Sequence, residues 1–476
     1  MPQKDEELKK RQERREALRK KKQAEARRLK LTALIAILVL IASGFGIYKL
    51  TRKAPAESAE LQAMETSPAE TSKPTRPIDK DPITTIHIKA AGDLNVTTRV
   101  VDSGLAVSGY DYSPVFKDVA AILADADLTV MNFEGNVCGE PYGSETTSAP
   151  IQLLSALRGC GVDLLQMANS CAINNGLNGL TATLNSIRSA GMEPLGAYAT
   201  ASELKASKGY TMTEIQGIKV AFVAFTKGLG GRGMPAGSEG LVNLLYKDYA
   251  TTYKEVDKEG ITSILKNVAA EKPDITIAML HWGSEYNDDI SKTRNSIVSL
   301  MQAQGVDVII GTHPHTLQPI LFDEDKGTLV VYSLGDFFGD AARGATNYSL
   351  ILDIEITQDA NAGTTKVTDF TFTPIYTITE SESIGNNDRK VVRISKAIEA
   401  NQGNFLDKIN DTCKANMEYA LTRIDERIAT TEELDCPGCN KTVSALVNKV
   451  GVLVNEATCA NCKTKLAAGS RMRDYK

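Results

Sequence analysis

The stretch Gly311-Thr312-His313-Pro314-His315-Thr316-Leu317-Gln318 directly follows Val306 to Ile310, a run that is apolar except for Asp307 and is typical of a strand. Two of the four histidines of the chain stand in this stretch, and Pro314 between them restricts the turn. Imidazole is the commonest metal ligand and a frequent acid–base group, so this concentration indicates a site. Taken alone, however, a His-x-His is more often a turn with two surface histidines.

Five other strand-like runs in the chain are also followed by polar residues. In chain order, the six runs lead to Asp93, Glu134, Asn169, His281, the pair His313 and His315, and Asp336. Ligands of open α/β sheets bind outside the carboxyl ends of the strands, and carboxylates, amide oxygens and imidazoles are metal ligands. Single Asp and Asn residues at such places often cap helices or form turns. Polar residues at the ends of all six strand-like runs favour a metal or anion site. His87 lies inside a strand pattern and is interpreted as structural.

The charge of the chain is distributed unevenly. Residues 1–30 carry 13 basic and 6 acidic side chains, whereas the other 446 residues carry 41 basic and 53 acidic ones. An acidic main body argues against nucleic acid as the ligand.

The segment Leu31 to Tyr48 contains eighteen residues without a charge, enough for a helix of about 27 Å that spans the apolar core of a bilayer. A buried core helix is the alternative, but only Thr32 and Ser43 interrupt the apolar run. We therefore predict a cytoplasmic tail at 1–30, a retained single-pass membrane anchor at 31–48, a disordered linker at 49–82 and an extracellular main domain at 83–380.

The motifs of the main domain resemble those of the CapA family, the capsule or poly-γ-glutamate synthesis proteins related to calcineurin-like metallophosphoesterases. The matching pieces are Gly92-Asp93-Leu94, Asn132-Phe133-Glu134-Gly135, Gly176 to Leu184, His281 to Tyr286, Gly311 to Gln318 and Tyr332 to Phe337. The resemblance implies an α/β four-layer sandwich with a divalent metal (Mn, Fe or Zn). It also implies a membrane-anchored role in making, exporting or attaching an anionic extracellular polymer.

Four positions depart from the pattern of the family. The family usually has Asn-Asn-His followed by Asp and Gly, whereas this chain has Asn169-Ser170-Cys171 and then Asn174; Asp336 stands where the family commonly has Asn. Serine is a poor bridging ligand, and a cysteine differs from histidine in pKa and geometry. Because hydrolysis at a dinuclear centre needs both metals, we expect at most one tightly held ion and weak or absent phosphodiesterase activity.

Two Cys-x-x-Cys pairs mark the C-terminal region, Cys436/Cys439 and Cys459/Cys462. Pairs at this separation are typical of a zinc ribbon, in which four thiolates hold one ion. We predict a helical linker at 381–432 and a zinc-binding module at 433–470. Outside the cell these cysteines could form disulfides instead, and disulfides between the two pairs stay open.

Three functions are compatible with these features. In the first, Asp93, Glu134, Asn169, His281, His313 and His315 hold metal in a hydrolase or transferase, with His281, His313, Asp336 and Cys171 as the candidate catalytic residues. In the second, the domain is an anchored receptor for a capsule or wall polymer. In the third, the chain is a scaffold of a cell-envelope synthesis complex, whose ribbon and basic tail recruit other membrane proteins. The oligomeric state is not predicted.

Overall fold

The computed structural model describes residues 82–384, 389–402, 408–449, 451–454 and 456–475. The predicted tail, anchor and nearly all of the predicted linker lie outside these residues. Within them, no helix combines the length and the apolar character needed to cross a bilayer. Apart from residues 106–110, they belong to one compact unit that begins at Pro82.

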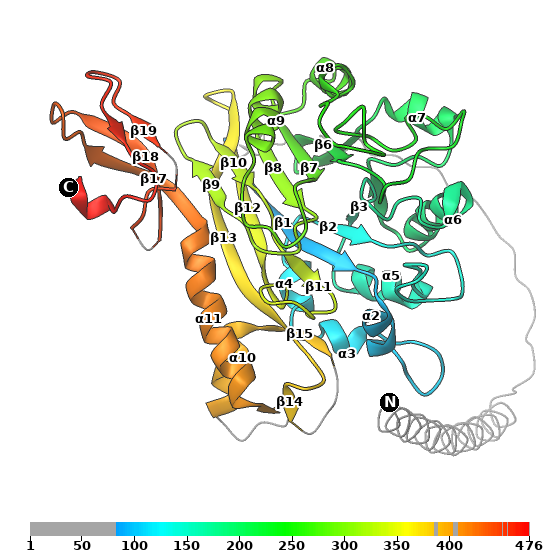
Figure 1. Ribbon diagram of the computed structural model, residues 1–476. Coiled ribbons are helices and arrows are strands. Elements are labelled where there is room, and N and C mark those ends of the chain that lie inside the picture. The colour runs from blue at the N-terminus through cyan, green and yellow to red at the C-terminus, as the bar shows by residue number, and fades with distance from the viewer. Residues whose placement is uncertain (1–81, 385–388, 403–407, 450, 455, 476) are drawn as a thin grey trace, which may run out of the picture. The chain divides into compact units, whose positions relative to one another are not determined.

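The first of two large sheets is built around β1 (Ile83–Asn95) (Figure 1). On one side of β1 stand the parallel strands β2 (Leu128–Glu134), β3 (Leu164–Gln166) and β4 (Glu193–Leu195). On its other side stand the antiparallel strands β12 (Tyr348–Asp359), β13 (Thr364–Ile378) and β15 (Lys390–Arg393). The short strand β11 (Asp336–Phe338) also pairs with β1, so that Asp336 stands opposite Asp93.

The second sheet has the parallel strands β6 (Ile218–Thr226), β7 (Ile275–His281), β8 (Val308–Thr312) and β10 (Thr328–Val331) at its centre. All residues of β7 and β8 are buried, as expected for apolar strands covered on both faces. Strand β5 (Thr211–Ile215) forms one edge, and β9 (Ile320–Asp323), β17 (Ile428–Asp435) and β18 (Thr442–Asn448) continue the sheet beyond β10.

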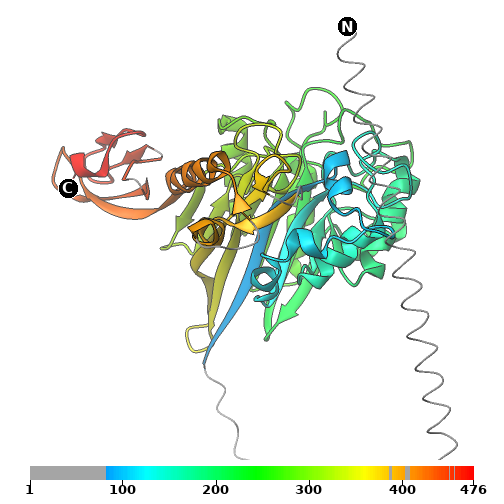
Figure 2. The same cartoon turned by 90° about the horizontal axis from the view of Figure 1, so that it is seen from below.

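Helices cover these sheets. A single apolar cluster joins the second sheet to α8 (Lys258–Ala270) and α9 (Lys292–Ala303), with Trp282 fully buried in it. Helices α5 (Ile151–Gly159) and α6 (Gly176–Ser189) connect the strands of the first sheet, where α6 packs against β4. Figure 2 shows α10 (Ile394–Gln402) and α11 (Asp411–Arg427) in orange beside the yellow strand β13, which both helices contact.

The remaining elements are short. They are the helices α2 (Thr98–Ser103), α3 (Ser113–Phe116), α4 (Ala120–Ala124) and α7 (Ala201–Ser207), the 3-10 helix η1 (Met472–Asp474), and the strand pairs β14 (Ser383–Ile384) with β16 (Lys408–Ile409) and β19 (Ala457–Thr458) with β20 (Lys465–Leu466). The two large sheets approach closely, since a Cβ added to Gly196 after β4 would lie 2.6 Å from the carbonyl oxygen of Ala224 in β6. The predicted α/β sandwich of packed sheets and covering helices is thus confirmed.

An aspartate fixes the start of four parallel strands in the same way. The backbone N–H of each aspartate donates to the carbonyl of a residue on the neighbouring strand, and its carboxylate accepts the N–H of that same residue, at 2.7–3.0 Å. The pairs are Asp127 with His87, Asp163 with Thr129, Asp274 with Lys219 and Asp307 with Thr276. Two bonds to one residue fix the register of adjacent strands, and register determines which residues reach the carboxyl ends.

One strand assignment from the sequence needs correction. The run Thr328 to Tyr332 was predicted to lead to Asp336 as a single strand end, but β10 belongs to the second sheet and Asp336 to the first. The chain crosses between the sheets at Ser333–Gly335. Gly92 and Gly335 allow this crossing, because a Cβ on Gly92 would lie 1.9 Å from the carbonyl oxygen of Gly335.

Candidate metal centre

Six buried ionisable side chains gather where the two sheets meet. The first sheet contributes three carboxylates, Asp93 of β1, Glu134 at the end of β2 and Asp336 at the start of β11. The second sheet contributes three imidazoles, His281 at the end of β7 and, after β8, His313 and His315. From the sequence, these residues were expected together at the carboxyl ends of strands in one sheet. Instead, the site lies between two, with acidic groups from one sheet and imidazoles from the other.

The side-chain atoms of these residues are close enough to share a cation. Nε2 of His281 lies 3.4 Å from Glu134 Oε1, and Nε2 of His315 lies 3.8 Å from Glu134 Oε2. Three overlapping groups each have all potential ligand atoms within 4.8 Å of one another: Glu134, His313 and His315; Asp93, Glu134 and His281; and Asp93, His315 and Asp336. This spacing is suited to divalent metal coordination by nitrogen and oxygen.

Unpartnered atoms provide a test of whether a metal fits this cluster. Glu134 Oε2, His281 Nε2 and His313 Nδ1 are buried and have no hydrogen-bond partner. Burying a polar atom without a partner costs about 1–3 kcal/mol. A cation facing these three atoms, which belong to neighbouring residues of the cluster, would supply the partner that each of them lacks. The residues present therefore fit a divalent metal.

The electrostatics of the cluster also favour a cation. Burial, together with the neighbouring carboxylates of Glu134 and Asp336, raises the pKa of Asp93 to about 8. Burial likewise raises the pKa of Asp336. Although burial opposes it, the neighbouring His281, with smaller effects of His315 and His313, lowers the pKa of Glu134. Three carboxylates in one buried cluster repel one another, and a metal ion would relieve that repulsion.

The three imidazoles have different environments. Burial and the neighbouring His281 lower the pKa of His313 well below its usual value, and burial lowers that of His281 despite Glu134. Burial also disfavours the charged form of His315, but Asp336 at 2.7 Å outweighs it and raises the pKa of His315 well above its usual value. Neutral imidazoles are the form that binds metals, so His281 and His313 are the better prepared ligands.

The His-Pro-His turn is held in a strained shape. His313 has φ 93° and His315 has φ 59°, both in the region that side chains other than glycine rarely adopt. The N–H of His313 donates to Asp93 Oδ2 across the two sheets at 3.0 Å, which fixes the turn against β1. Gly311 is required before the turn, because a Cβ there would lie 2.0 Å from the carbonyl oxygen of Tyr332.

Asn169 was expected to be a metal ligand, but hydrogen bonds to neighbouring residues occupy its side chain. Its amide nitrogen donates to Asn132 Oδ1 and to the carbonyls of Phe133 and Gln166, and its Oδ1 accepts the N–H of Cys171. Both ends of the side chain are therefore occupied, and its place is that of a structural residue. Asn132 links it to the site, since Asn132 Nδ2 donates to Asp93 Oδ1 at 2.7 Å.

Ser170 and Cys171 stand beside Glu134 without forming a metal-type group. The Ser170 hydroxyl donates to Glu134 Oε1, and it lies 3.9 Å from the sulfur of Cys171. Burial and the Glu134 carboxylate raise the pKa of the Cys171 thiol to about 12, so the thiol is protonated at neutral pH. Among the described residues, Cys171 joins none of the groups with metal-ligand spacing.

Lys227, whose Nζ lies 3.4 Å from His313 Nε2, was not predicted from the sequence. Lys227 directly follows β6, so the rule that identified the other residues, a polar side chain after a strand-like run, would have found it. Thr312 was also missed. Its hydroxyl contacts His281 Nδ1 at 3.2 Å and donates to Gln166 Oε1 at 3.1 Å, which joins β7, β8 and β3.

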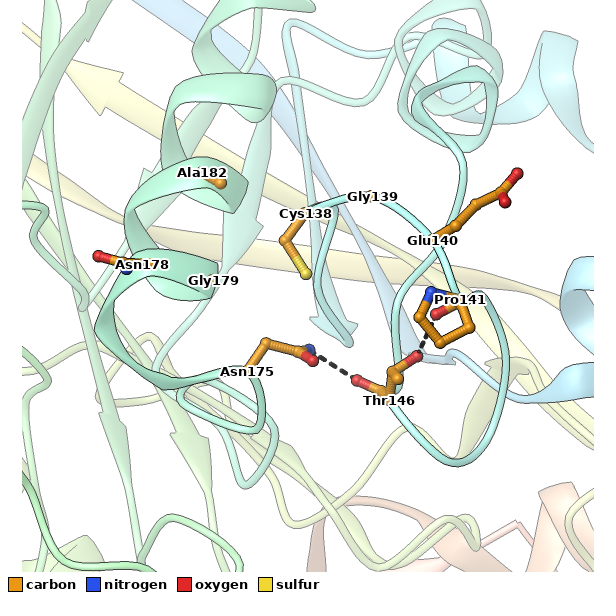
Figure 3. A pocket seen from close by; sticks show the side chains of 9 residues that line it. All are labelled: Cys138, Gly139, Glu140, Pro141, Thr146, Asn175, Asn178, Gly179 and Ala182. Carbon is orange, nitrogen blue, oxygen red and sulfur yellow. Dashed lines mark hydrogen bonds between the residues drawn. The ribbon is translucent and has the colours of Figure 1, made fainter.

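A cavity of about 420 Å³ lies between the loop after β2 and the start of α6 (Figure 3). Asn175 closes part of it by donating to the carbonyl of Thr146 at 2.7 Å. Its lining includes one carboxylate, Glu140, and no histidine or cation. This cavity therefore lacks the groups that make the cluster suitable for a metal.

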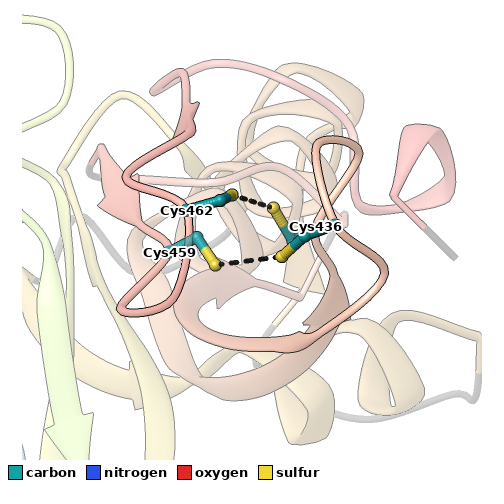
Figure 4. A group of neighbouring side chains, drawn as sticks. Cys436, Cys459 and Cys462 are labelled. Carbon is teal, nitrogen blue, oxygen red and sulfur yellow. Dashed lines mark hydrogen bonds between the residues drawn. The ribbon is translucent and has the colours of Figure 1, made fainter.

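The C-terminal cysteines form a second cluster (Figure 4). Cys436 and Cys462 have their sulfurs 3.4 Å apart, those of Cys439 and Cys459 are 3.7 Å apart, and all four lie within 4.8 Å of one another. Tetrahedral zinc with Zn–S bonds of about 2.3 Å places sulfurs about 3.8 Å apart, whereas a disulfide needs about 2.05 Å. The geometry fits a four-thiolate metal site that packs against the apolar core of the ribbon.

The model of the family described as bacterial capsule synthesis protein PGA_cap matches residues 87–341. The PGA biosynthesis protein CapA of Bacillus subtilis (strain 168) is 26% identical over 247 residues, covering 51% of this chain and 61% of that protein. The capsule biosynthesis protein CapA of Bacillus anthracis is 25% identical over 261 residues, covering 53% of this chain and 60% of that protein. The chain thus spans about three fifths of the length of these relatives.

Solved structures were compared as well. The calcineurin-like phosphoesterase YfkN from Bacillus subtilis is 19% identical with a TM-score of 0.39, covering 71% of this chain and 100% of that one. A novel phosphatase from Mycoplasma pneumoniae is 13% identical with a TM-score of 0.38, and the match covers 61% of this chain and 94% of that one.

Proposed function

Because the chain belongs to the bacterial capsule synthesis protein family, we propose that it acts in the biosynthesis or export of an anionic extracellular polymer such as poly-γ-glutamate. Its main domain would hold one divalent metal ion in the cluster between the two sheets. The observation that carries this proposal is the set of three unpartnered buried atoms on Glu134, His281 and His313.

The residues of the cluster have distinct roles in this proposal. Glu134 would hold the ion together with His281 and His313, each of which shares one group of metal-ligand spacing with Glu134, and the ion would supply Lewis-acid chemistry there. Asp336 fixes the ring of His315 through the 2.7 Å contact with Nδ1 and leaves Nε2 directed to Glu134. Carboxylate–histidine pairs of this kind orient metal ligands and adjust their basicity.

A second candidate function is binding of the polymer without turnover. It is favoured by the substitutions beside Glu134, where the Ser170 hydroxyl occupies Oε1 and the Cys171 thiol stays protonated. Neither side chain replaces the Asn and His that the resemblance implies. In this function the domain would guide the polymer away from its synthase complex, and the chain would serve as a receptor or scaffold.

Two further features belong to the proposal. Residues 31–48 would anchor the chain in the cell membrane with the tail 1–30 in the cytoplasm, and the cysteines of the ribbon would bind one zinc ion. Mass spectrometry of the membrane-extracted protein is expected to find residues 1–30 still attached. A mature N-terminus beyond residue 48 would refute the anchor.

Elemental analysis tests the metal centre. The purified chain is expected to contain one zinc ion from the ribbon and one further divalent ion from the main domain. Glu134→Gln should remove the second ion and keep the first, because the amide loses the charge that balances the cation. Exposed Glu255 offers a matched control, Glu255→Gln, which should retain both. Equal metal content in the two variants would contradict the proposed centre, and hydrolysis of a phosphodiester would favour turnover over binding alone.

A further inference from the structure

A second cavity, of about 250 Å³, lies beside the candidate metal centre, and two cationic side chains line it. Lys227 and Arg294 line it together with Tyr253, Ser284 and Thr293. Most of the other lining side chains carry hydroxyl groups. Unlike the cavity near Glu140, this one combines positive charge with hydrogen-bond donors.

Lys227 connects this cavity to the candidate metal centre. Its backbone N–H donates to the carbonyl of His281 at 2.7 Å, and its Nζ donates to the carbonyl of Gly283 at 2.6 Å. The same Nζ lies 3.4 Å from His313 Nε2 and 4.7 Å from the centre of the Tyr253 ring. The ammonium group is therefore held between the cavity and the imidazoles by neutral groups alone.

Arg294 is buried in the wall of the cavity, with 2% of its surface exposed. Its guanidinium donates to Gln318 Oε1 at 2.6 Å and to the carbonyl of Asp289. It lies 5.8 Å from the ring centres of both Trp282 and Tyr332. These partners position the group but do not neutralise it.

Neither cation has a counter-ion within the described part of the chain. No carboxylate there lies within 4 Å of Lys227 Nζ or of the Arg294 guanidinium, although Glu285 acts on Lys227 and Asp289 acts on Arg294 from farther away. A buried charge without an opposite charge is costly. The first turn of α9, which contributes Thr293 and Arg294, adds the positive end of a helix dipole. A structural role in holding the surrounding loops explains the three side-chain hydrogen bonds of Lys227 and Arg294. It does not explain why two cationic groups without an ion pair line one polar cavity.

We propose that this cavity binds an oxyanion, either a carboxylate or a phosphate, that belongs to the substrate of the adjacent metal centre. An oxygen in hydrogen-bond contact with Lys227 would lie within roughly 6 Å of His313, because Lys227 Nζ is 3.4 Å from His313 Nε2. The cavity thereby fixes one anionic group of a chain-like substrate while the neighbouring bond approaches the cluster. The identity of the substrate rests on the proposed function, whereas the anion site itself does not.

Calorimetric titration of the full chain with a γ-linked glutamate trimer and, separately, with inorganic phosphate tests the proposal. Lys227→Met is expected to weaken binding of the trimer about tenfold, because it removes one charge-assisted contact. Ser284→Asp, a change at an exposed position of the lining, should weaken binding similarly by placing a negative charge there. Lys247→Gln removes an exposed cation outside the lining and should leave the affinity unchanged. Fluorescence of buried Trp282 verifies that each variant is folded.

The outcomes separate the anion site from the proposed function. Phosphate binding that is lost in Lys227→Met, without binding of the trimer, would support the anion site and refute the polymer substrate. Binding of the trimer that neither Lys227→Met nor Ser284→Asp weakens would overturn the anion site and leave the proposed function standing. A wild-type chain that binds neither probe would overturn the anion site as well.

Discussion

Replacing Asp307 with asparagine is expected to stabilise the protein at pH 8 and to leave its stability at pH 4.5 little changed. Asp307 stands at the start of β8, the strand that leads to the His-Pro-His turn, and its carboxylate accepts the N–H of Thr276 at 2.8 Å. Burial outweighs this hydrogen bond and raises the pKa of Asp307 to about 6. The ionised form is therefore disfavoured in the folded protein.

The sign and the size of the effect follow from this pKa. The folded protein holds the proton of Asp307 more tightly than the unfolded chain, so the group stabilises the fold at low pH and loses that contribution as the pH rises through about 6. A difference of roughly two pKa units corresponds to about 3 kcal/mol, of which about 2 kcal/mol falls between pH 4.5 and pH 8. The amide oxygen of an asparagine can still accept the N–H of Thr276, but it does not ionise.

Urea denaturation at the two pH values measures the difference. Trp282 is the only tryptophan of the chain and is fully buried in the apolar cluster of the second sheet, so its fluorescence reports on the unfolding of that sheet. The gain of Asp307→Asn over wild type should be about 2 kcal/mol larger at pH 8 than at pH 4.5. Asp163→Asn is the matched control, since Asp163 makes the same two bonds at the start of β3 but pairs with Arg158. It should not stabilise the protein at pH 8. A gain for Asp307→Asn that is equal at both pH values would refute the reasoning.

Three other predictions concern the His-Pro-His turn, the cluster and the ribbon. Gly311→Ala should destabilise the fold by about 3 kcal/mol in the same denaturation assay, because its Cβ would overlap a backbone carbonyl oxygen. Gly159→Ala is the control and should not destabilise the fold, because its Cβ would meet open space. Equal stability of the two variants would contradict the close approach at Gly311. Ser170→Asn combined with Cys171→His should raise the metal content of the main domain by elemental analysis, and two ions in the unmodified domain would contradict the expectation of at most one tightly held ion. Cys459→Ser should abolish zinc binding by the ribbon in the same measurement, and unchanged zinc content, or four oxidised thiols after denaturation, would refute the zinc site.

The sequence by itself determined the local elements and the order of the motifs. Alternation and apolar runs depend on a few neighbouring residues, and they located six strands near their observed positions. The same local reading selected Asp93, Glu134, His281, His313 and His315 as polar residues that follow such strands. The sequence also indicated the pairing of the four C-terminal cysteines, although their spacing left both a zinc site and disulfides between the pairs open.

The tertiary structure alone decided how these elements combine. Local patterns do not state which strands pair, so the division of the cluster between two sheets and the transfer of Asp336 to the first sheet were not predicted. Nor do they state which hydrogen bonds a polar side chain makes, and for that reason Asn169 was expected to hold metal although its partners occupy it on both ends. Lys227 and Arg294 are 67 positions apart in the sequence. Only the packing of α9 against the second sheet brings their charges to one cavity.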